Sequence, residues 1–457
     1  MKNYCAMLDP LRFGAALCVA VFHLTFWSWA WPSTGVAPGF EHYVAADLQL
    51  RSAAPLTWFG WVGVEIFFVI SGFVIANSAH KCSPAEFLFN RALRLYPAVW
   101  VCATLTFIVL LIAGGSSSSE FILPYVWAML LIPKGLNGQW LDSIYWTLAA
   151  EMAFYGLVFC TLLTKKITLR HLAFGLTLYS GAFNAFSLLV LSGAIRSETL
   201  YFVVLMFRVP CATWLLNHGC FFALGIWLFI SANRKLTAIE QLAVAVTCLS
   251  GCAEIFYFSS YLTLNIGDIS GQSALVPIAV WAGAVSLIAL AARRSRTSLG
   301  EASRAGSSYL RTLGLITYPL YLTHNVIGSA VIRLLIDAGL DAYQAVAAGL
   351  GLLALVCWFI SAKVEPAIRG LLRELFSNIR RLPKLEPGIV RRALGRVTEF
   401  PAIVQFVKRQ FGGHRSVHSH ASLIDAPLFP RAHDLANSWE TQLIPIPVHG
   451  KSRGRQA

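Results

Sequence analysis

Long apolar stretches recur along this chain, and they constrain its fold more than any other feature of the sequence. A run of about 20 apolar residues can cross the hydrocarbon core of a bilayer as an α-helix. Hydrophobic residues make up 57% of the 457 residues and charged residues only 13%, a balance that excludes a soluble globular protein. We therefore predict an all-α integral membrane protein with about ten transmembrane helices, at residues 8–29, 56–77, 95–113, 143–164, 169–192, 210–231, 238–258, 273–292, 312–335 and 344–362.

Two apolar runs need a separate interpretation. The run at 121–132 is too short to span a bilayer, and we predict that it dips into the membrane interface. The run at 8–29 is too long for a signal peptide and lacks a small-residue cleavage motif, so it is predicted to remain as the first helix.

Lysine and arginine are unevenly distributed between alternate loops, and this asymmetry predicts the orientation in the membrane. If the N-terminus is cytoplasmic, the cytoplasmic loops carry Lys81, Arg91, Arg94, Lys165, Lys166, Arg170, Arg234, Lys235, Arg293, Arg294, Arg296, Arg304 and Arg311. The opposite loops and adjacent helix ends carry only Arg51, Lys134, Arg196, Arg208 and Arg333. We therefore predict a cytoplasmic N-terminus, and we attribute the net charge of +14 to topology and not to nucleic-acid binding.

Beyond residue 362 the sequence changes from apolar to basic. Leu371, Leu372 and Leu375 belong to an apolar helical stripe with arginines on the opposite side, and residues 389–397 repeat the pattern. Basic amphipathic helices bind the anionic inner leaflet of a membrane. We predict a ten-helix membrane domain at 1–364, interfacial helices at 365–411 and a disordered cytoplasmic tail at 412–457.

The cysteines and histidines do not predict a metal centre. The ten cysteines are scattered without a CxxC pair, and the histidines of the tail are too loosely spaced for zinc. No phosphate-binding loop, dinucleotide-binding fingerprint or zinc-protease motif is recognisable. We therefore expect no bound metal and no bound cofactor.

Arg12 and His23 are the most informative polar residues of the first apolar run. Their separation of eleven positions is almost three helical turns, so both lie on one face, roughly 16 Å apart along the axis. A histidine at that depth is costly to bury and marks a functional site by default. The alternative is that His23 only donates a hydrogen bond to a neighbouring helix while Arg12 anchors the helix at the interface.

Further polar residues lie at or inside the other predicted helices. Glu151, in YWTLAAEMAFY, needs a buried partner, for which His23 or an arginine is the economical candidate; it would then orient the imidazole or act as a base. Arg91 and Arg94 lie three positions apart at the cytoplasmic end of the third helix, where they could bind phosphate or serve only as positive-inside anchors.

Four residues complete the set of possible site members. Tyr321 and His324 belong to a polar seam in the ninth helix, and Glu65 lies near the outer end of the second. Ser71 adjoins Gly72, and such a small pair lets another helix approach closely. For each of these residues, a purely structural role remains the alternative.

Taken together, five stretches resemble the membrane-bound acyltransferase family 3, bacterial integral-membrane O-acyltransferases that act on surface or exported polysaccharides. They read LDPLRFGAALCVAVFH, GVEIFFVISGFVIA, RALRLYP, YWTLAAEMAFY and ITYPLYLTHNV, and they follow the family's order from residue 8 to about 362. Pro10, Thr147 and Met152 depart from the residues usual in the family. The arginine, histidine and glutamate of its motifs are all present.

This resemblance implies a multi-pass protein of the bacterial inner membrane that moves an acyl group from cytoplasmic acyl-CoA to a hydroxyl of a glycan or lipid-linked sugar. It assigns His23 and Glu151 to catalysis and Arg12, Arg91 and Arg94 to the donor. His23 would deprotonate the acceptor hydroxyl or carry the acyl group transiently. Acetyl-CoA is the expected donor. The alternative is a transporter or flippase of acyl groups or lipid-linked glycans, although no internal repeat is visible.

Overall fold

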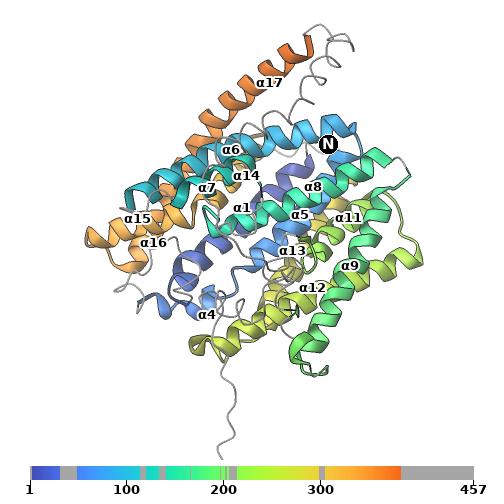
Figure 1. Ribbon diagram of the computed structural model, residues 1–457, viewed down its shortest axis with the longest axis horizontal. Helices are drawn as coiled ribbons and strands as arrows, with labels where there is room; N and C mark the ends of the chain where they lie inside the picture. The colour runs from blue at the N-terminus through green and yellow to red at the C-terminus, as the bar shows by residue number, and fades with distance from the viewer. Residues whose placement is uncertain are drawn as a thin grey trace, which may run out of the picture. The chain divides into compact units, whose positions relative to one another are not determined.

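The structure is a computed structural model that describes residues 3–381, apart from 31–48, 114–119, 133–139, 165, 196, 201–202, 205–213 and 298–303. All regular elements within these residues are helical (Figure 1). In chain order they are α1 (Asn3–Val21), η1 (Phe22–Trp27), α2 (Ser28–Ala30), α4 (Ala54–Thr57), α5 (Val62–Ala79), α6 (Pro84–Ala113), α7 (Ile122–Leu130), η3 (Ser143–Tyr145), α8 (Trp146–Thr164), α9 (Leu169–Leu191), α11 (Gly219–Asn233), α12 (Ala238–Asn265), η5 (Gly267–Ile269), α13 (Leu275–Thr297), α14 (Arg304–Thr323), α15 (Val326–Asp337), α16 (Ala342–Phe359), η6 (Ile360–Val364) and α17 (Glu365–Arg381).

Eight helical segments of the described residues are long and apolar enough to cross a membrane. The pair α14 and α15, bent by 80° at a short break, would make a ninth, and α11 is apolar but only 15 residues long. These segments coincide in position with the ten predicted runs, although residues 210–213 lie outside the described part of the chain. An all-helical membrane protein is thus confirmed, whereas the number of spans and the cytoplasmic N-terminus stay predictions.

Two predicted helices differ in detail from the observed ones. The run at 312–335 is interrupted at His324 and Asn325, between α14 and α15. The run at 344–362 continues without a break through η6 into α17, so the helix does not end where the basic sequence begins. Both differences arise because apolar composition shows where a helix crosses a bilayer and says little about where it bends or continues into the polar region.

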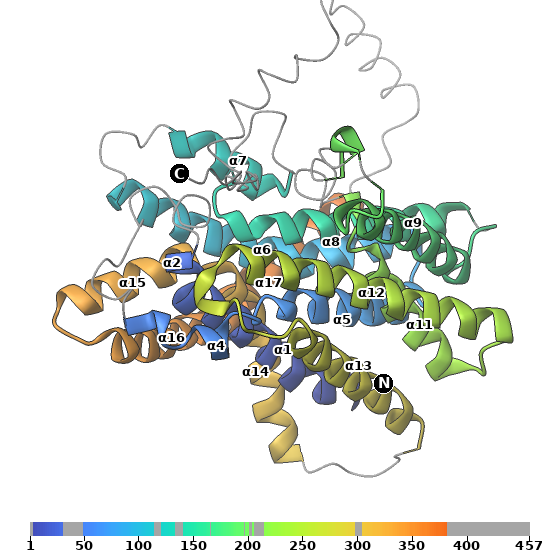
Figure 2. The same ribbon diagram turned by 90° about the horizontal axis from the view of Figure 1, so that it is seen from below.

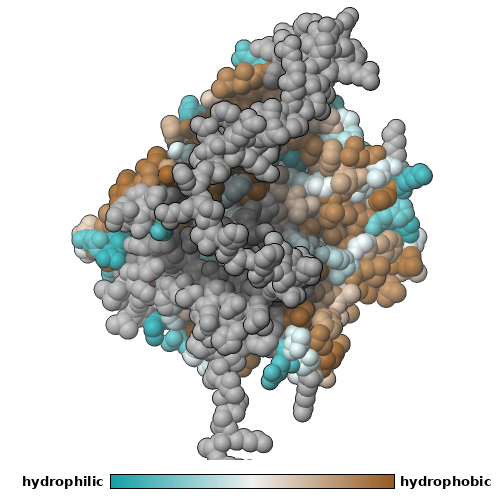
Figure 3. Space-filling model, in the orientation of Figure 1, coloured by the Kyte–Doolittle hydropathy of each residue, from teal (hydrophilic) through white to brown (hydrophobic). Residues whose placement is uncertain are grey.

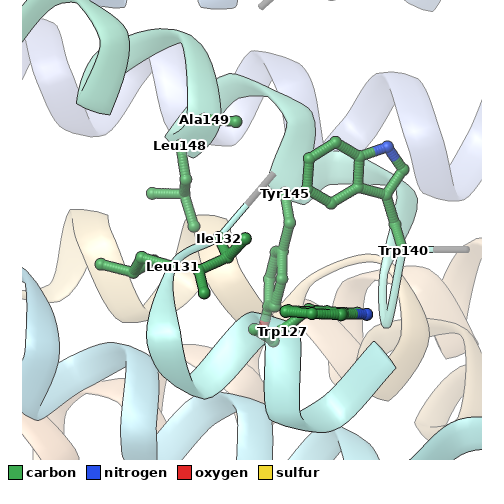
Figure 4. A pocket seen from close by; sticks show the side chains of 8 residues that line it. Trp127, Leu131, Ile132, Trp140, Tyr145, Leu148 and Ala149 are labelled. Carbon is green, nitrogen blue, oxygen red and sulfur yellow. The ribbon is translucent and has the colours of Figure 1, made fainter. Parts of the chain in front are cut away.

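The short run at 121–132 forms α7, a helix of nine residues, in agreement with the prediction that it cannot span. Trp100 of α6 donates its indole N–H to the carbonyl of Met129 at 3.0 Å, which fastens the end of α7 to α6. Between α7 and the start of α8 lies a small apolar pocket, whose lining includes Trp127, Leu131, Trp140 and Tyr145 (Figure 4).

The helix α5 lies at the centre of the bundle. Its span is the most buried of the eight, with 78% of its apolar window inside the protein. In Figures 1 and 2, α5 and α1 run between the other helices of residues 1–369. A Cβ at Gly72 would collide with the backbone carbonyl of Phe222, and one at Gly225 would collide with the carbonyl of Val69. These glycines therefore let α5 and α11 pack backbone to backbone, as the Ser71–Gly72 pair predicted.

Replacing Gly72 by alanine is expected to destabilise the bundle by about 1–3 kcal/mol, because the new methyl group must displace the backbone of α11. Gly156→Ala in α8 is the matched control, since its Cβ would meet no atom within 4 Å. Thermal unfolding in detergent should give a lower midpoint for Gly72→Ala and an equal or higher midpoint for Gly156→Ala. Equal midpoints for the two variants would contradict the close contact of α5 with α11.

The described surface carries many exposed apolar side chains, as expected where helices face lipid. Leu178 of α9 and Leu249 of α12 are 68% and 70% exposed. Figure 3 shows apolar side chains spread over much of the described surface on one face.

By its internal contacts the chain divides into residues 1–369 and 370–457. The second unit is described only at 370–381, where α17 exposes Leu371, Leu375 and Phe376. The predicted boundary at 364/365 stays a prediction. The predicted second amphipathic segment and the tail at 412–457 lie outside the described residues.

Candidate active site

His23 lies in a short π-helical segment and not in a continuous α-helix. The chain winds as an α-helix to Val21 and as a π-helix from Phe22 to Trp27. Single π turns inside α-helices are rare and often occur at functional sites. This distortion, which the apolar pattern does not reveal, places the partly buried imidazole of His23 between helices.

A second histidine contacts His23. The Nε2 atom of His324 lies 3.2 Å from the Nδ1 atom of His23, and the two rings have centroids 5.1 Å apart. His324 is fully buried. Its Nδ1 atom lies 2.8 Å from the carbonyl oxygen of Tyr321, and Nδ1 of His23 also lies 3.0 Å from the carbonyl oxygen of Val19. The structure thus brings together two predicted site members that are 301 positions apart.

The break between α14 and α15 is held by a carboxylate that the sequence interpretation missed. Asp142 accepts hydrogen bonds from the side chain of Asn325 at 2.8 Å and from the backbone N–H of Val326 at 3.2 Å. Burial raises the pKa of Asp142 to about 6, although these bonds favour its ionised form. An aspartate directly before an apolar run is a helix-cap signal, and Asp142 could have been noticed on that ground.

Tyr321 points its hydroxyl at a neighbouring helix. The hydroxyl oxygens of Tyr321 and Thr147 lie 2.9 Å apart, which joins α14 to the first turn of α8. The Tyr321 ring also contacts the imidazole of His324 with centroids 5.5 Å apart. Tyr321 therefore lies in the shell around the histidine pair.

Glu151 has different partners from those predicted. Its Oε1 atom accepts hydrogen bonds from Tyr155 at 2.7 Å and from Ser71 at 3.2 Å, and no hydrogen bond to His23 is found among the described residues. The expectation that Glu151 pairs with His23 or an arginine is therefore wrong. The physical reason is that nearer groups already bind both side chains. The hydroxyls of Tyr155 and Ser71 donate to the carboxylate, and Nδ1 of His23 has the carbonyl of Val19 and the imidazole of His324 as partners.

The two arginines of α6 differ in how they are held. Arg91 donates to the hydroxyl of Ser78 at 3.1 Å, and its guanidinium lies 6.0 Å from the centre of the Tyr155 ring, a cation–π distance. A connected path of contacts therefore runs from Arg91 through Tyr155 to Glu151. Arg94 makes no hydrogen bond and no ion pair within the described part of the chain, although its charge interacts with the carboxylate of Glu365.

Arg12 and Glu65 lie in other environments. Arg12 is 3.6 Å from the carboxylate of Asp9, one turn earlier on α1. Glu65 lies 3.4 Å from Nδ1 of His218, whose ring packs against Trp146 and Phe68. Neither Arg12 nor Glu65 has a described hydrogen bond to His23 or His324.

Comparison with known proteins adds an independent finding. A sequence model of a protein family, described as an acyltransferase domain, matches residues 6–363. Similar curated proteins include Nodulation protein 10 of Rhizobium leguminosarum bv. viciae, 32% identical over 32% of this chain and 41% of that protein. The exopolysaccharide production protein ExoZ of Rhizobium meliloti is 33% identical over 21% of this chain and 32% of its own length. The acyltransferase MdmB of Streptomyces mycarofaciens is 32% identical over 36% of this chain and 41% of its own length.

The match to these curated proteins is partial, because each alignment covers less than half of the relative. No solved structure matches the chain.

Proposed function

The chain belongs to this acyltransferase family, since the family match covers residues 6–363, and from that premise we propose that it transfers an acetyl group from cytoplasmic acetyl-CoA to a hydroxyl of an exported or surface glycan. The proposal places it in the bacterial inner membrane with ten spans and a cytoplasmic N-terminus. The name of the relative ExoZ, an exopolysaccharide production protein, supports a glycan acceptor.

The observation that carries the proposal is the position of His23, inside an apolar span, on a π turn and beside a second histidine. In the proposed reaction, Nε2 of His23 takes the proton of the acceptor hydroxyl as the oxygen attacks the thioester carbonyl. The carbon–sulfur bond then breaks, and the departing thiolate of CoA takes the proton from the imidazolium. The products are a glycan ester and CoA, with no net change in protons.

The arginines of α6 support the donor half of the proposal. A CoA ester carries several phosphate charges, and guanidinium groups bind phosphate through charge-assisted hydrogen bonds. We assign Arg94 as the main phosphate ligand because it has no other described hydrogen-bond partner, with Arg91 beside it. Arg12 is a weaker candidate, since Asp9 lies next to its guanidinium.

A transporter or flippase of acyl groups or lipid-linked glycans is the second candidate, and one observation favours it. The pair α14 and α15 forms a helix broken by an 80° bend, and broken helices often line the binding sites of transporters. Such a protein would move its cargo across the membrane without forming an ester.

Inverted membrane vesicles distinguish the two candidates. Acetyl-CoA labelled in the acetyl group is supplied outside such vesicles, where the cytoplasmic face is exposed. We expect label in a base-labile ester of the glycan fraction for vesicles with this protein and none for vesicles without it. Glycan that crosses the membrane with no ester formed would contradict the acyltransferase proposal and support the transporter.

Replacing Glu151 by glutamine tests whether this carboxylate acts on the donor side. Because Glu151 is linked to Arg91 through Tyr155, we expect an increase of about fivefold in KM for acetyl-CoA, which corresponds to about 1 kcal/mol, with kcat nearly unchanged. Tyr155→Phe keeps the ring beside Arg91 but removes the hydrogen bond to Glu151, and it should behave in the same way. A large loss of kcat at unchanged KM in Glu151→Gln would instead indicate a direct part in proton transfer.

A further inference from the structure

We propose that His324 is the positioning residue of this site: it accepts a hydrogen bond from Nδ1–H of His23 and thereby holds Nε2 of His23 as the free base. This inference rests on the proposed acyl transfer. It assigns to His324 an effect that is exerted entirely through His23, with no contact to the donor or the acceptor.

The donors and acceptors around the pair determine where the protons lie. A backbone carbonyl only accepts hydrogen bonds, so Nδ1 of His324, which is 2.8 Å from the carbonyl oxygen of Tyr321, must carry a proton. In a neutral imidazole the other nitrogen is then an acceptor. Nε2 of His324 therefore accepts from Nδ1 of His23, which also faces the carbonyl of Val19. Nε2 of His23 keeps its lone pair.

The same bonds decide which histidine can act as the base. Both ring nitrogens of His324 are engaged, and its side chain is fully buried. His23 is only partly buried, and its Nε2 has no hydrogen-bond partner within the part of the chain that the structure describes. A substrate hydroxyl can therefore reach Nε2 of His23, whereas no nitrogen of His324 is open to it.

The surrounding helices hold His324 in place. His324 is the first residue after α14, and its own backbone N–H still donates to the carbonyl of Leu320 at 3.0 Å. The following residue, Asn325, is bound by Asp142, and Tyr321 is bound by Thr147. A break in a membrane helix is tolerated where its backbone groups find partners inside the protein. Here the break lies where the imidazole of His324 contacts His23 of η1.

The hydrogen bond between His23 and His324 becomes stronger when His23 is protonated. As Nε2 of His23 takes a proton, the imidazolium makes Nδ1–H a charged donor, and its bond to the neutral His324 becomes charge-assisted. The transition state therefore gains more from His324 than the ground state does, and such a difference raises kcat without changing donor binding.

The first test compares two substitutions of His324 in the full-length protein in bilayers. His324→Phe keeps a ring but removes the imidazole acceptor and leaves the carbonyl of Val19, and it should lower kcat by about 10-fold to 100-fold, the range for a hydrogen bond to a charged group. The KM for acetyl-CoA should stay within about twofold, since no described contact joins His324 to the arginines. His324→Gln places an oxygen near the former Nε2 and should recover most of the loss.

A double-substitution cycle excludes a merely structural role. If His324 acts only through His23, His324→Phe should cause no further loss of rate in a His23→Asn background. An equal loss in both backgrounds, or a wild-type kcat for His324→Phe, would overturn the assignment.

A measurement of the tautomers tests the assignment even if no acyl transfer is found. Nitrogen-15 solid-state NMR of the histidine-labelled protein in bilayers should show two neutral imidazoles protonated at Nδ1, one missing in His23→Asn and one in His324→Phe. A His23 signal protonated at Nε2 would overturn the proposal. Failure of the transfer assay with these NMR signals present would count against the proposed function alone.

Discussion

Replacing His23 by asparagine is expected to lower kcat for acyl transfer by about 10²-fold to 10⁴-fold, the usual contribution of a general base. Asparagine retains a polar group that can bond to His324 and Val19, but it has no nitrogen able to take a proton at neutral pH. The substitution therefore removes the base and keeps the partners of its neighbours satisfied. Initial rates in membranes, normalised to the amount of protein that binds acetyl-CoA, measure the effect.

The control for this substitution is His80→Asn. His80 is exposed directly after α5, and the side-chain contact described for it is with the ring of Phe229, with centroids 6.2 Å apart. It should leave kcat unchanged. If His23→Asn transferred acyl groups as fast as the wild type, the base would have to be another residue, and the family membership would be unaffected.

The second large effect is expected at Arg94. Arg94→Ala should raise the KM for acetyl-CoA by about 10-fold to 100-fold, because charge-assisted bonds to phosphate are worth about 1.5–3 kcal/mol. Arg94 makes no described hydrogen bond, so the substitution breaks none, although it also removes a charge that interacts with Glu365. Arg91→Ala is a less specific test, since Arg91 also binds Ser78 and contacts the Tyr155 ring.

The choice of donor makes the Arg94 prediction specific. Acetyl-pantetheine lacks the phosphates of acetyl-CoA, so Arg94→Ala and the wild type should have the same KM for it. Arg333→Ala, at an exposed position near Asp337, is the matched control and should change neither value. A loss that is equally large with acetyl-pantetheine would mean that Arg94 does not bind the phosphates.

Most of the helical segments could be placed from sequence because apolar length is a local property. A close approach of another helix at Gly72 could also be predicted, because small residues inside an apolar helix let a neighbouring helix pack closely. The bend at His324 and the π turn at His23 could not be predicted from the sequence. The bend depends on hydrogen bonds between distant segments, such as that of Asp142 with Asn325, and the hydrophobic pattern of the sequence shows neither these bonds nor the π turn.

The candidate site was predictable residue by residue but not in its pairing. Ionisable groups inside apolar runs are conspicuous, so His23, Glu151 and His324 all stood out. Which of them meet depends on how the helices pack. The carboxylate of Glu151 accepts hydrogen bonds from hydroxyl groups, and the imidazole of His23 contacts that of His324, 301 residues away. The sequence favoured a pair of Glu151 with His23 because both are ionisable. It does not show which hydroxyl and carbonyl groups lie close enough to compete as hydrogen-bond partners.

The most direct measurement uses the purified protein in bilayers, acetyl-CoA labelled in the acetyl carbonyl, and a glycan fraction from which existing esters have been removed. We predict a labelled, base-labile ester on the glycan with the wild type, and almost none with His23→Asn at equal occupancy by acetyl-CoA. Equal ester formation by both proteins would contradict the role of His23. Glycan that crosses the bilayer without acquiring label would contradict acyl transfer itself.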